Sequence, residues 1–286
     1  MAYNTHIKKN KKIAVSIVVV LFFLWLIVTN IVVGVTTIEV SYEELPEAFD
    51  GYRIVQLSDL HNAEYGSKNK SLVDKIKKVN PDMIAITGDL IDSSATNIDI
   101  AIAFTIELTK IAPCYYVTGN HEAWVDDNTY RALEQGLMEK GVTILRDSEV
   151  LLEQDDAVIS LIGIDDPEFA HKNNGIAKNM VVDEINKLSS VNHFSILLSH
   201  RPEYYNVYKR TDVNLVLAGH AHGGQFRLPF IGGIIAPNQG LFPQYDSGLY
   251  QEDEFAMVVS RGIGNSVIPI RFNNQPEIIV IDLLKE

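Results

Sequence analysis

The sequence has little cysteine and little positive charge. Cys114 is the single cysteine among 286 residues, so an intrachain disulfide is excluded. Its place in the apolar stretch of residues 114–117 favours a buried structural thiol. Lys and Arg number 24 against 37 Asp and Glu, which gives a formal net charge of −13. A chain this acidic lacks the excess of basic residues that is typical of nucleic-acid-binding proteins, so we expect no nucleic-acid partner.

Internal repeats and low-complexity segments are also absent from the sequence. A length of 286 residues suits one large domain plus a short extra segment. The apolar content of 47% is ordinary for a globular protein and allows a sizeable core.

Residues 13–35 form a long apolar run, interrupted only by Ser16, Thr29, Asn30 and Gly34. At about 1.5 Å per residue, such a helix crosses a bilayer core of about 30 Å. A cleaved signal has an apolar core of only about 7–15 residues followed by a small-residue cleavage site. The run is longer and no clear A-x-A pattern follows it, so an uncleaved anchor is favoured over a cleaved signal. A buried core helix is a third interpretation, but such helices are rarely apolar all round.

The charges that flank this run predict its orientation. Four basic residues precede it, namely Lys8, Lys9, Lys11 and Lys12. Four glutamates follow it before Arg53, namely Glu39, Glu43, Glu44 and Glu47. By the positive-inside rule, residues 1–36 form a cytoplasmic tail and transmembrane anchor. Residues 37–286 then form one extracytoplasmic domain at the cell membrane.

Strand-like and helix-like segments alternate through most of the domain. Residues 36–51 form a short linker or an opening strand. Strands are expected over residues 53–57, 83–87, 114–117, 158–164, 194–198 and 215–218, and in the tail over 256–260 and 277–283. Helical spacing predicts helices over residues 70–79, 98–111 and 129–140. This alternation implies βαβ units, and the β-rich tail indicates a second sheet.

Five short polar motifs each follow an apolar run. They are Asp59-Leu60-His61, Gly88-Asp89, Gly119-Asn120-His121-Glu122, Ser199-His200 and Gly219-His220-Ala221-His222. Five of the eight histidines lie in these motifs, together with carboxylate and amide side chains. Sites in open α/β sheets form outside the carboxyl ends of strands. The pattern therefore predicts a metal site built from several loops and large enough for two metals.

Spacing within the motifs adds detail. On an extended segment, residues i and i+2 point to the same side, so Asp59 and His61 could face one cation. The same spacing lets His220 and His222 reach different metals, and the two carboxylate oxygens of Asp89 could bridge two cations. Glycine precedes a ligand at three places, Gly88, Gly119 and Gly219, where a missing side chain permits a tight turn or close approach.

The ordered motif set resembles the signature of the calcineurin-like metallophosphoesterases, from about Tyr52 to the end of the chain. Residues 219–225, 260–264 and 268–271 resemble one bacterial branch, the membrane-associated or exported phosphohydrolases. Ala221 departs from the Thr common in that branch, but it lies between two ligands and points elsewhere. The resemblance implies an α/β fold, a four-layer αββα sandwich preceded here by one transmembrane helix.

The resemblance also implies roles for the motif residues. One metal would be held by Asp59, His61, Asp89 and His222, and the other by Asp89, Asn120, His200 and His220. His121 is similar to the family histidine that protonates the leaving oxygen or stabilises charge, and Glu122 could hold that imidazole. Mixed carboxylate, amide and imidazole ligands suit Mn, Fe, Zn and Co nearly alike. Asp165 and Asp166 fit turn roles as well as the site, and Arg201 could grip phosphate or lie at the surface.

These residues predict a membrane-anchored, dinuclear metal-dependent phosphoesterase that uses a metal-activated hydroxide. Its substrate could be a phosphomonoester, a phosphodiester or a lipid-linked diphosphate. The branch resembles the UDP-diacylglucosamine pyrophosphatases of lipid A synthesis, but the outward orientation favours a cell-envelope or scavenged phosphoester. Residues 228–242, which are apolar and rich in Gly and Pro, could accept a lipid tail or pack on the sheet. The alternative is a catalytically silent scaffold of the same fold, and the oligomeric state stays open.

Overall fold

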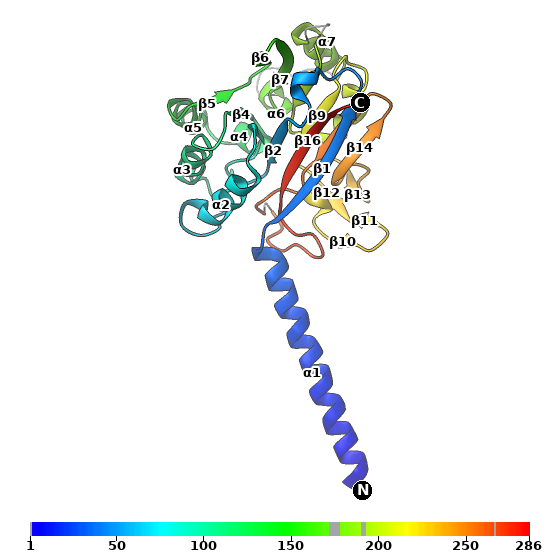
Figure 1. Ribbon diagram of the computed structural model, residues 1–286. Helices are drawn as coiled ribbons and strands as arrows, with labels where there is room; N and C mark the ends of the chain where they lie inside the picture. The colour runs from blue at the N-terminus through cyan, green and yellow to red at the C-terminus, as the bar shows by residue number, and fades with distance from the viewer. Residues whose placement is uncertain (1, 172–177, 190–192, 266) are drawn as a thin grey trace.

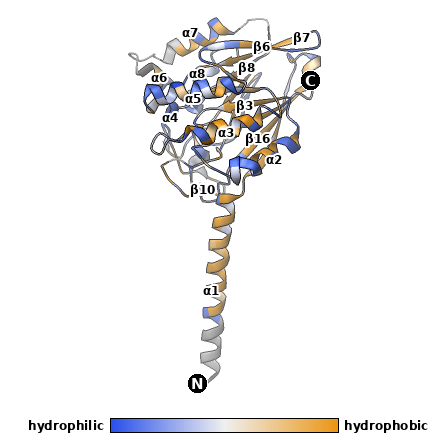
Figure 2. Ribbon diagram, turned by 90° about the vertical axis from the view of Figure 1, so that its left-hand side faces the viewer, coloured by the Kyte–Doolittle hydropathy of each residue, from blue (hydrophilic) through white to orange (hydrophobic). Residues whose placement is uncertain are grey.

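The computed structural model describes residues 2–171, 178–189, 193–265 and 267–286. A rounded domain contains two six-stranded sheets, and one long helix projects from it (Figure 1). This helix, α1 (Ala2–Ile31), continues into the first strand through a short turn. Its apolar part spans residues 11–31, is long enough to cross a membrane and has none of its length buried (Figure 2). The exposure of α1 argues against a buried core helix.

The first sheet has the strand order β1-β16-β2-β3-β4-β5. Its strands are β1 (Gly34–Tyr42), β16 (Glu277–Lys285), β2 (Arg53–Leu57), β3 (Met83–Thr87), β4 (Cys114–Val117) and β5 (Val142–Ile144). Strands β2 to β5 run parallel, as βαβ units require. The connecting helices are α2 (Lys70–Val79), α3 (Ile98–Leu108) and α5 (Asp127–Glu139). They cover the outer face of this sheet with buried Leu72, Phe104 and Leu133.

The second sheet has the strand order β14-β15-β9-β8-β7-β6. Its strands are β14 (Gly248–Glu252), β15 (Phe255–Val259), β9 (Leu215–Ala218), β8 (Ser195–Leu198), β7 (Ala157–Gly163) and β6 (Ser148–Gln154). The helices α7 (Lys178–Leu188) and α8 (Tyr205–Tyr208) cover its outer face through Ile185 and Tyr208.

The two sheets pack against each other through a largely apolar layer, which the buried Gln56 crosses to reach the Ala218 carbonyl. In β3, Met83 and Ala85 face the second sheet, whereas Ile84 and Ile86 face the helices. The strand period of two places successive side chains on opposite faces, so a strand buried on both faces is apolar throughout. The predicted αββα sandwich is therefore confirmed.

The β-rich tail had indicated a second sheet. The structure contains that sheet, but the tail strands are divided between the two sheets. Strand β16 enters the first sheet between β1 and β2, parallel to β1 and antiparallel to β2. Strand β15 instead pairs with β9 in the second sheet. The opening-strand interpretation of residues 36–51 holds for β1, because the register pairs all nine of its residues with β16.

Short elements complete the chain near the carboxyl ends of the central strands. They are α4 (Asn120–Trp124), α6 (Pro167–His171), and the strand pairs β10 (Arg227–Leu228) with β11 (Gly232–Gly233) and β12 (Ile235–Ala236) with β13 (Gly240–Leu241). The last two pairs lie within the apolar segment of residues 228–242.

Candidate metal centre

The predicted ligands come from both sheets and meet at one end of the sandwich. Asp59, Asp89 and Asn120 follow β2, β3 and β4 of the first sheet. His200 and His220 follow β8 and β9 of the second sheet. All are buried, although each side chain is polar. The structure thus brings the carboxylates and imidazoles that the sequence analysis named as metal ligands into two neighbouring groups, and Asn120 is buried at the end of β4.

Most ligand residues have an uncommon backbone conformation. Positive φ angles occur at Asp59 (53°), His61 (46°), Asp89 (52°), His220 (65°) and His222 (48°). This left-handed region is unfavourable for residues with a side chain and persists mainly where function demands it. The segments are therefore not extended, and our geometric reason for the D-x-H spacing was wrong. Tight turns, not strand alternation, direct the side chains to a common point.

Glycines make this close packing possible. A Cβ atom on Gly119 would lie 2.2 Å from Asp89 Oδ1, and one on Gly219 would lie 1.9 Å from Ser58 Oγ. A Cβ atom on Gly88 would lie 2.6 Å from His200 Nδ1. These distances confirm the close approach that was expected for glycine before each ligand.

Asp59, His61 and His222 form the first ligand group. The Nε2 atoms of His61 and His222 lie 3.1 Å apart, and His222 Nε2 lies 3.4 Å from Asp59 Oδ1. Two nitrogens each about 2.1 Å from one cation are separated by about 3.0–3.4 Å. The spacing of this group therefore fits a single bound cation.

Asp89, His200 and His220 form the second ligand group. His200 Nδ1 lies 2.7 Å from the Thr87 carbonyl oxygen, which can only accept, so Nδ1 carries a proton. His200 Nε2 faces Asp89 Oδ2 at 3.2 Å. Burial lowers the pKa of His200, but Asp89 outweighs this and raises it to about 10. The proton on His200 Nε2 thus lies between the imidazole and the Asp89 carboxylate, where a cation bound by both groups would lie.

Asn120 gives an independent test of whether a metal fits. Its Oδ1 is buried and has no hydrogen-bond partner among the residues that the structure describes. An unpaired buried oxygen is costly, and a cation would satisfy it. The residues present thus fit a metal centre.

Asp89 lies between the two ligand groups. Its Oδ2 is 3.2 Å from His200 Nε2 and 3.6 Å from His61 Nε2. Burial raises the pKa of Asp89, but the histidines around it, His200 foremost, lower it well below its usual value. The pKa of Asp59 is also lowered, because His222, His61 and His200 outweigh its burial. Two ionised carboxylates in a buried space require compensating positive charge.

The two histidines of the last motif are neutral and held from outside the ligand groups. Burial lowers the pKa of both His220 and His222 to about 3, and neutral imidazole is the form that binds metals. In the tautomer with its proton on Nε2, His220 donates to the Asn238 amide oxygen at 3.1 Å and keeps Nδ1 for a metal. Arg271 Nη2 lies 3.3 Å from His222 Nδ1, while Nε2 of that ring faces Asp59.

His121 lies beside the first ligand group but is held differently. Its ring contacts that of His61 edge to face, with centroids 4.5 Å apart. The Ser93 backbone N–H donates to His121 Nδ1 at 3.0 Å, so the neutral ring carries its proton on Nε2. Burial lowers the pKa of His121, which favours that neutral form.

Glu122 does not hold His121, contrary to our expectation. Its Oε2 accepts hydrogen bonds from the backbone N–H groups of Gly119 (2.8 Å) and Asp89 (2.9 Å). Glu122 thus connects the turn before Asn120 with the turn that carries Asp89. Ser93 holds the imidazole instead, and no local sequence signal marks that contact.

The burial of Arg201 contradicts the surface role considered for it, whereas phosphate binding by Arg201 stays a prediction. Arg201 is 3% exposed, and its guanidinium donates to both carboxylate oxygens of Asp166, at 2.5 and 2.8 Å. Its Nη1 lies 3.0 Å from His220 Nε2. Asp165 is turned away from Arg201 and pairs with Arg146. Asp166 and Arg201 therefore form a buried ion pair next to the second ligand group.

Sequence reasoning missed three residues around the centre. Asp92 lies 3.8 Å from His61 Nδ1 and 3.9 Å from His121 Nδ1. Asn238 and Arg271 approach His220 and His222, as described above. Asp92 follows Asp89 by three residues, so its spacing was a usable signal, whereas Asn238 and Arg271 are distant along the chain.

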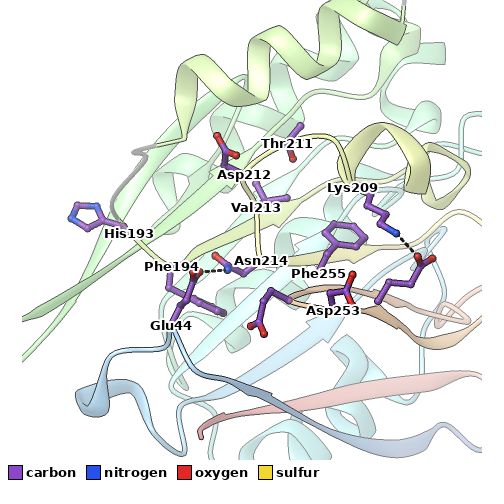
Figure 3. A pocket seen from close by; sticks show the side chains of 12 residues that line it. Glu44, His193, Phe194, Lys209, Thr211, Asp212, Val213, Asn214, Asp253 and Phe255 are labelled. Carbon is purple, nitrogen blue, oxygen red and sulfur yellow. Dashed lines mark hydrogen bonds and ion pairs between the residues drawn. The ribbon is translucent and has the colours of Figure 1, made fainter.

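A separate hollow of about 750 Å³ lies at the opposite ends of β8 and β9 (Figure 3). We call it the acidic hollow, and its polar lining residues are Glu44, His193, Lys209, Thr211, Asp212, Asn214, Glu252, Asp253 and Glu254. Lys209 is ion-paired with Glu252, and Asn214 donates to Glu44 at 3.0 Å. Its acidic lining would repel a phosphoester, which argues against the acidic hollow as the substrate site.

The calcineurin-like phosphoesterase family matches residues 52–224, which contain all the ligand residues. This chain belongs to that family. It is 35% identical to the metallophosphoesterase YkuE of Bacillus subtilis, over 84% of this chain and 81% of that protein. It is 27% identical to the phosphodiesterase YaeI of Escherichia coli, over 82% of each chain. These relationships and the site support a metal-dependent phosphohydrolase.

Two further comparisons concern the anchor and the fold. A bovine transmembrane protein with a metallophosphoesterase domain is 33% identical over 86% of this chain, which spans 56% of its length. The sulfate thiohydrolase SoxB of Thermus thermophilus shares the fold, with a TM-score of 0.50 and 10% identity over 76% of this chain and 52% of that one.

Proposed function

We propose that this chain is a membrane-anchored phosphoesterase that uses two divalent metal ions. The observation that supports it most is the convergence of six carboxylate and imidazole side chains from both sheets in one buried region, with Asp89 between two groups. One metal would be bound by Asp59, His61, Asp89 and His222. The other would be bound by Asp89, Asn120, His200 and His220.

Two divalent cations there would polarise phosphoryl oxygens and lower the pKa of a water molecule. The protein's part is to hold the ligands and to move a proton. In its neutral form His121 presents Nε2–H, which can hydrogen-bond to the leaving oxygen and stabilise charge there, whereas transfer of a proton to that oxygen requires the imidazolium form of His121. Asn238 and Glu122 keep a ligand imidazole and two ligand turns in position.

The substrate is proposed at the level of phosphoesters, with phosphomonoesters, phosphodiesters and lipid-linked diphosphates as candidates. The name of the Escherichia coli relative, a phosphodiesterase, favours testing diesters first. The full chain in detergent, loaded with Mn, should be assayed against all three classes. Activity on one class with close to two Mn per chain supports the proposal. Stoichiometric metal binding with no hydrolysis of any class would favour the catalytically silent scaffold.

The anchor and its orientation are a separate part of the proposal. The exposed apolar α1 and the bovine transmembrane relative support a single membrane span. The four lysines before the run and the glutamates after it support an orientation with residues 1–36 as tail and anchor and residues 37–286 outside. Protease added to intact protoplasts should digest the domain and spare the tail. Complete protection of the domain would reverse the orientation.

A further inference from the structure

Apolar side chains are exposed on two loops beside the metal centre. The first loop carries Leu228, Phe230, Ile231, Ile235, Leu241 and Phe242, and the second carries Val267 and Ile270. We call these eight residues the apolar rim. Phe230 is fully exposed and Val267 is 90% exposed. Soluble surfaces rarely leave such a group uncovered, so the rim indicates a contact surface.

Backbone and side-chain hydrogen bonds join the two loops of the rim. The Arg227 N–H donates to the Phe272 carbonyl at 2.9 Å. Gln225 Nε2 donates to the carbonyl oxygens of Ile268 and Ile270, each at 2.8 Å. The rim is therefore one surface on a connected support, and Figure 1 shows β10 and β11 at the end of the domain from which α1 leaves.

The membrane helix is bound to the second loop of the rim. Asn30 Oδ1 accepts from the Arg271 backbone N–H at 2.8 Å, and Asn30 Nδ2 donates to the Arg271 carbonyl at 2.8 Å. The Phe272 ring packs edge to face on Trp25, with centroids 5.6 Å apart. This pair of hydrogen bonds and the ring contact fix the rim against α1.

The contact with Trp25 sets the depth of the rim relative to the apolar span. Trp25 lies six residues before Ile31, the end of α1, which corresponds to about 9 Å along a helix. Phe272 is also 6.4 Å from the Phe22 ring, one turn deeper. Since residues 11–31 are the apolar span, Phe272 lies level with that span and not above it. A bilayer that holds α1 would therefore reach the rim.

Charge on the neighbouring helix fits the same partner. Five lysines lie in or next to α2, namely Lys68, Lys70, Lys75, Lys77 and Lys78. Figures 1 and 2 both show α2 in the half of the domain nearer α1. In a chain with a net charge of −13, such a local group is unusual. Lysines near a membrane surface are attracted to anionic headgroups.

We propose that the apolar rim lies in the lipid bilayer that holds α1, at the boundary between headgroups and acyl chains. This inference rests on the proposed membrane anchor. Asn238, between the strands of the first rim loop, contacts the ligand His220. A phosphoester in the headgroup layer would then lie beside the metal centre, and the favoured substrate class is a phosphoester whose apolar part stays in the bilayer.

The test uses lipid quenching of single fluorescent labels. Cys114 is buried, and burial raises its thiol pKa to about 12, so introduced cysteines can be labelled selectively after Cys114→Ser. Bimane would be attached in the full chain at F230C or V267C. Matched positions are L151C, an exposed apolar residue on β6, and V19C in α1. Each variant would be reconstituted in vesicles of phosphatidylglycerol and phosphatidylcholine that contain doxyl-labelled lipid.

We expect loss of emission at residues 230, 267 and 19, and unchanged emission at residue 151. Quenching at residue 19 alone would overturn the rim proposal and leave the anchor in place. A blue shift without quenching at residue 230 would mean that protein, such as a second copy of this chain, covers the rim, and would also overturn it. No quenching at residue 19 would overturn both proposals. Melting curves would identify misfolded variants, for which F242C replaces F230C.

Discussion

Strands β8 and β9 carry polar loops at both ends, and the two ends are built differently. At the carboxyl ends, His200, His220 and His222 are buried, and two of the three have left-handed backbones. At the amino ends, the acidic hollow has a volume of about 750 Å³, and some of its polar groups pair with one another. Burial of several carboxylates and imidazoles against one another distinguishes the metal centre from the acidic hollow.

The most severe test of this contrast is Asp89→Asn. The change keeps the shape but removes the charge between the two ligand groups, so Mn bound per chain should fall from near two towards zero. Because bound metal supplies several kcal/mol of transition-state stabilisation, turnover should fall about 1,000-fold. Elemental analysis after desalting and phosphodiesterase assays measure both. Asp212→Asn in the acidic hollow is the matched control and should change neither.

His121→Ala tests proton donation without removing a ligand. Turnover of substrates with poor leaving groups should fall by about 100- to 10,000-fold, with metal content unchanged. The loss should shrink for p-nitrophenyl esters, whose leaving group needs little protonation. His193→Ala at the acidic hollow serves as the control. An equal loss for good and poor leaving groups would assign His121 to charge stabilisation, and loss of metal would make it a structural residue.

Asn238→Ala tests a residue that acts through a ligand. Loss of the acceptor for His220 Nε2–H should weaken metal binding by about 10- to 100-fold, the usual range for such partners. Titration of metal-free protein with Mn gives the affinity, and activity should return at saturating Mn. Asn206→Ala, an exposed position on α8, should leave the affinity unchanged. Activity that stays low at saturating Mn would show that Asn238 does more than orient His220.

Gly119→Ala should have the smallest effect of the four substitutions, because it adds a methyl group next to Asp89 but removes no ligand or proton donor. Its Cβ would lie 2.2 Å from Asp89 Oδ1, and such crowding costs about 1–3 kcal/mol of unfolding free energy. Denaturant unfolding measures this loss. Gly34→Ala is the control, because its Cβ would meet neighbours at 3.5 Å, an ordinary contact distance. Equal stability of the two variants would contradict the close packing inferred around Asp89.

The sequence was sufficient to predict that the polar motifs converge, because each motif follows an apolar strand and the ends of parallel strands meet. It was not sufficient for features that depend on distant contacts. The left-handed turns at Asp59 and His220 arise from packing between the two sheets, and local propensity favours other conformations. Glu122 lies in one polar motif and Arg201 directly follows another, but the motifs do not show what these side chains contact. Burial beside Asp89 and Asp166 decides their roles. Strand composition identified β16 but not its pairing partner.

The hydrogen bonds between Asn30 and Arg271 have a consequence for how this protein is handled. Helix α1 does more than hold the domain at the membrane. Asn30 in its last turn hydrogen-bonds to the backbone of Arg271, whose guanidinium approaches His222. A recombinant fragment that begins after residue 36 would leave the Arg271 N–H and carbonyl without these partners and would uncover Phe272. Proteolytic release of the domain would remove the same contacts. Enzyme freed from the membrane is thus expected to differ from the anchored enzyme at the metal centre itself.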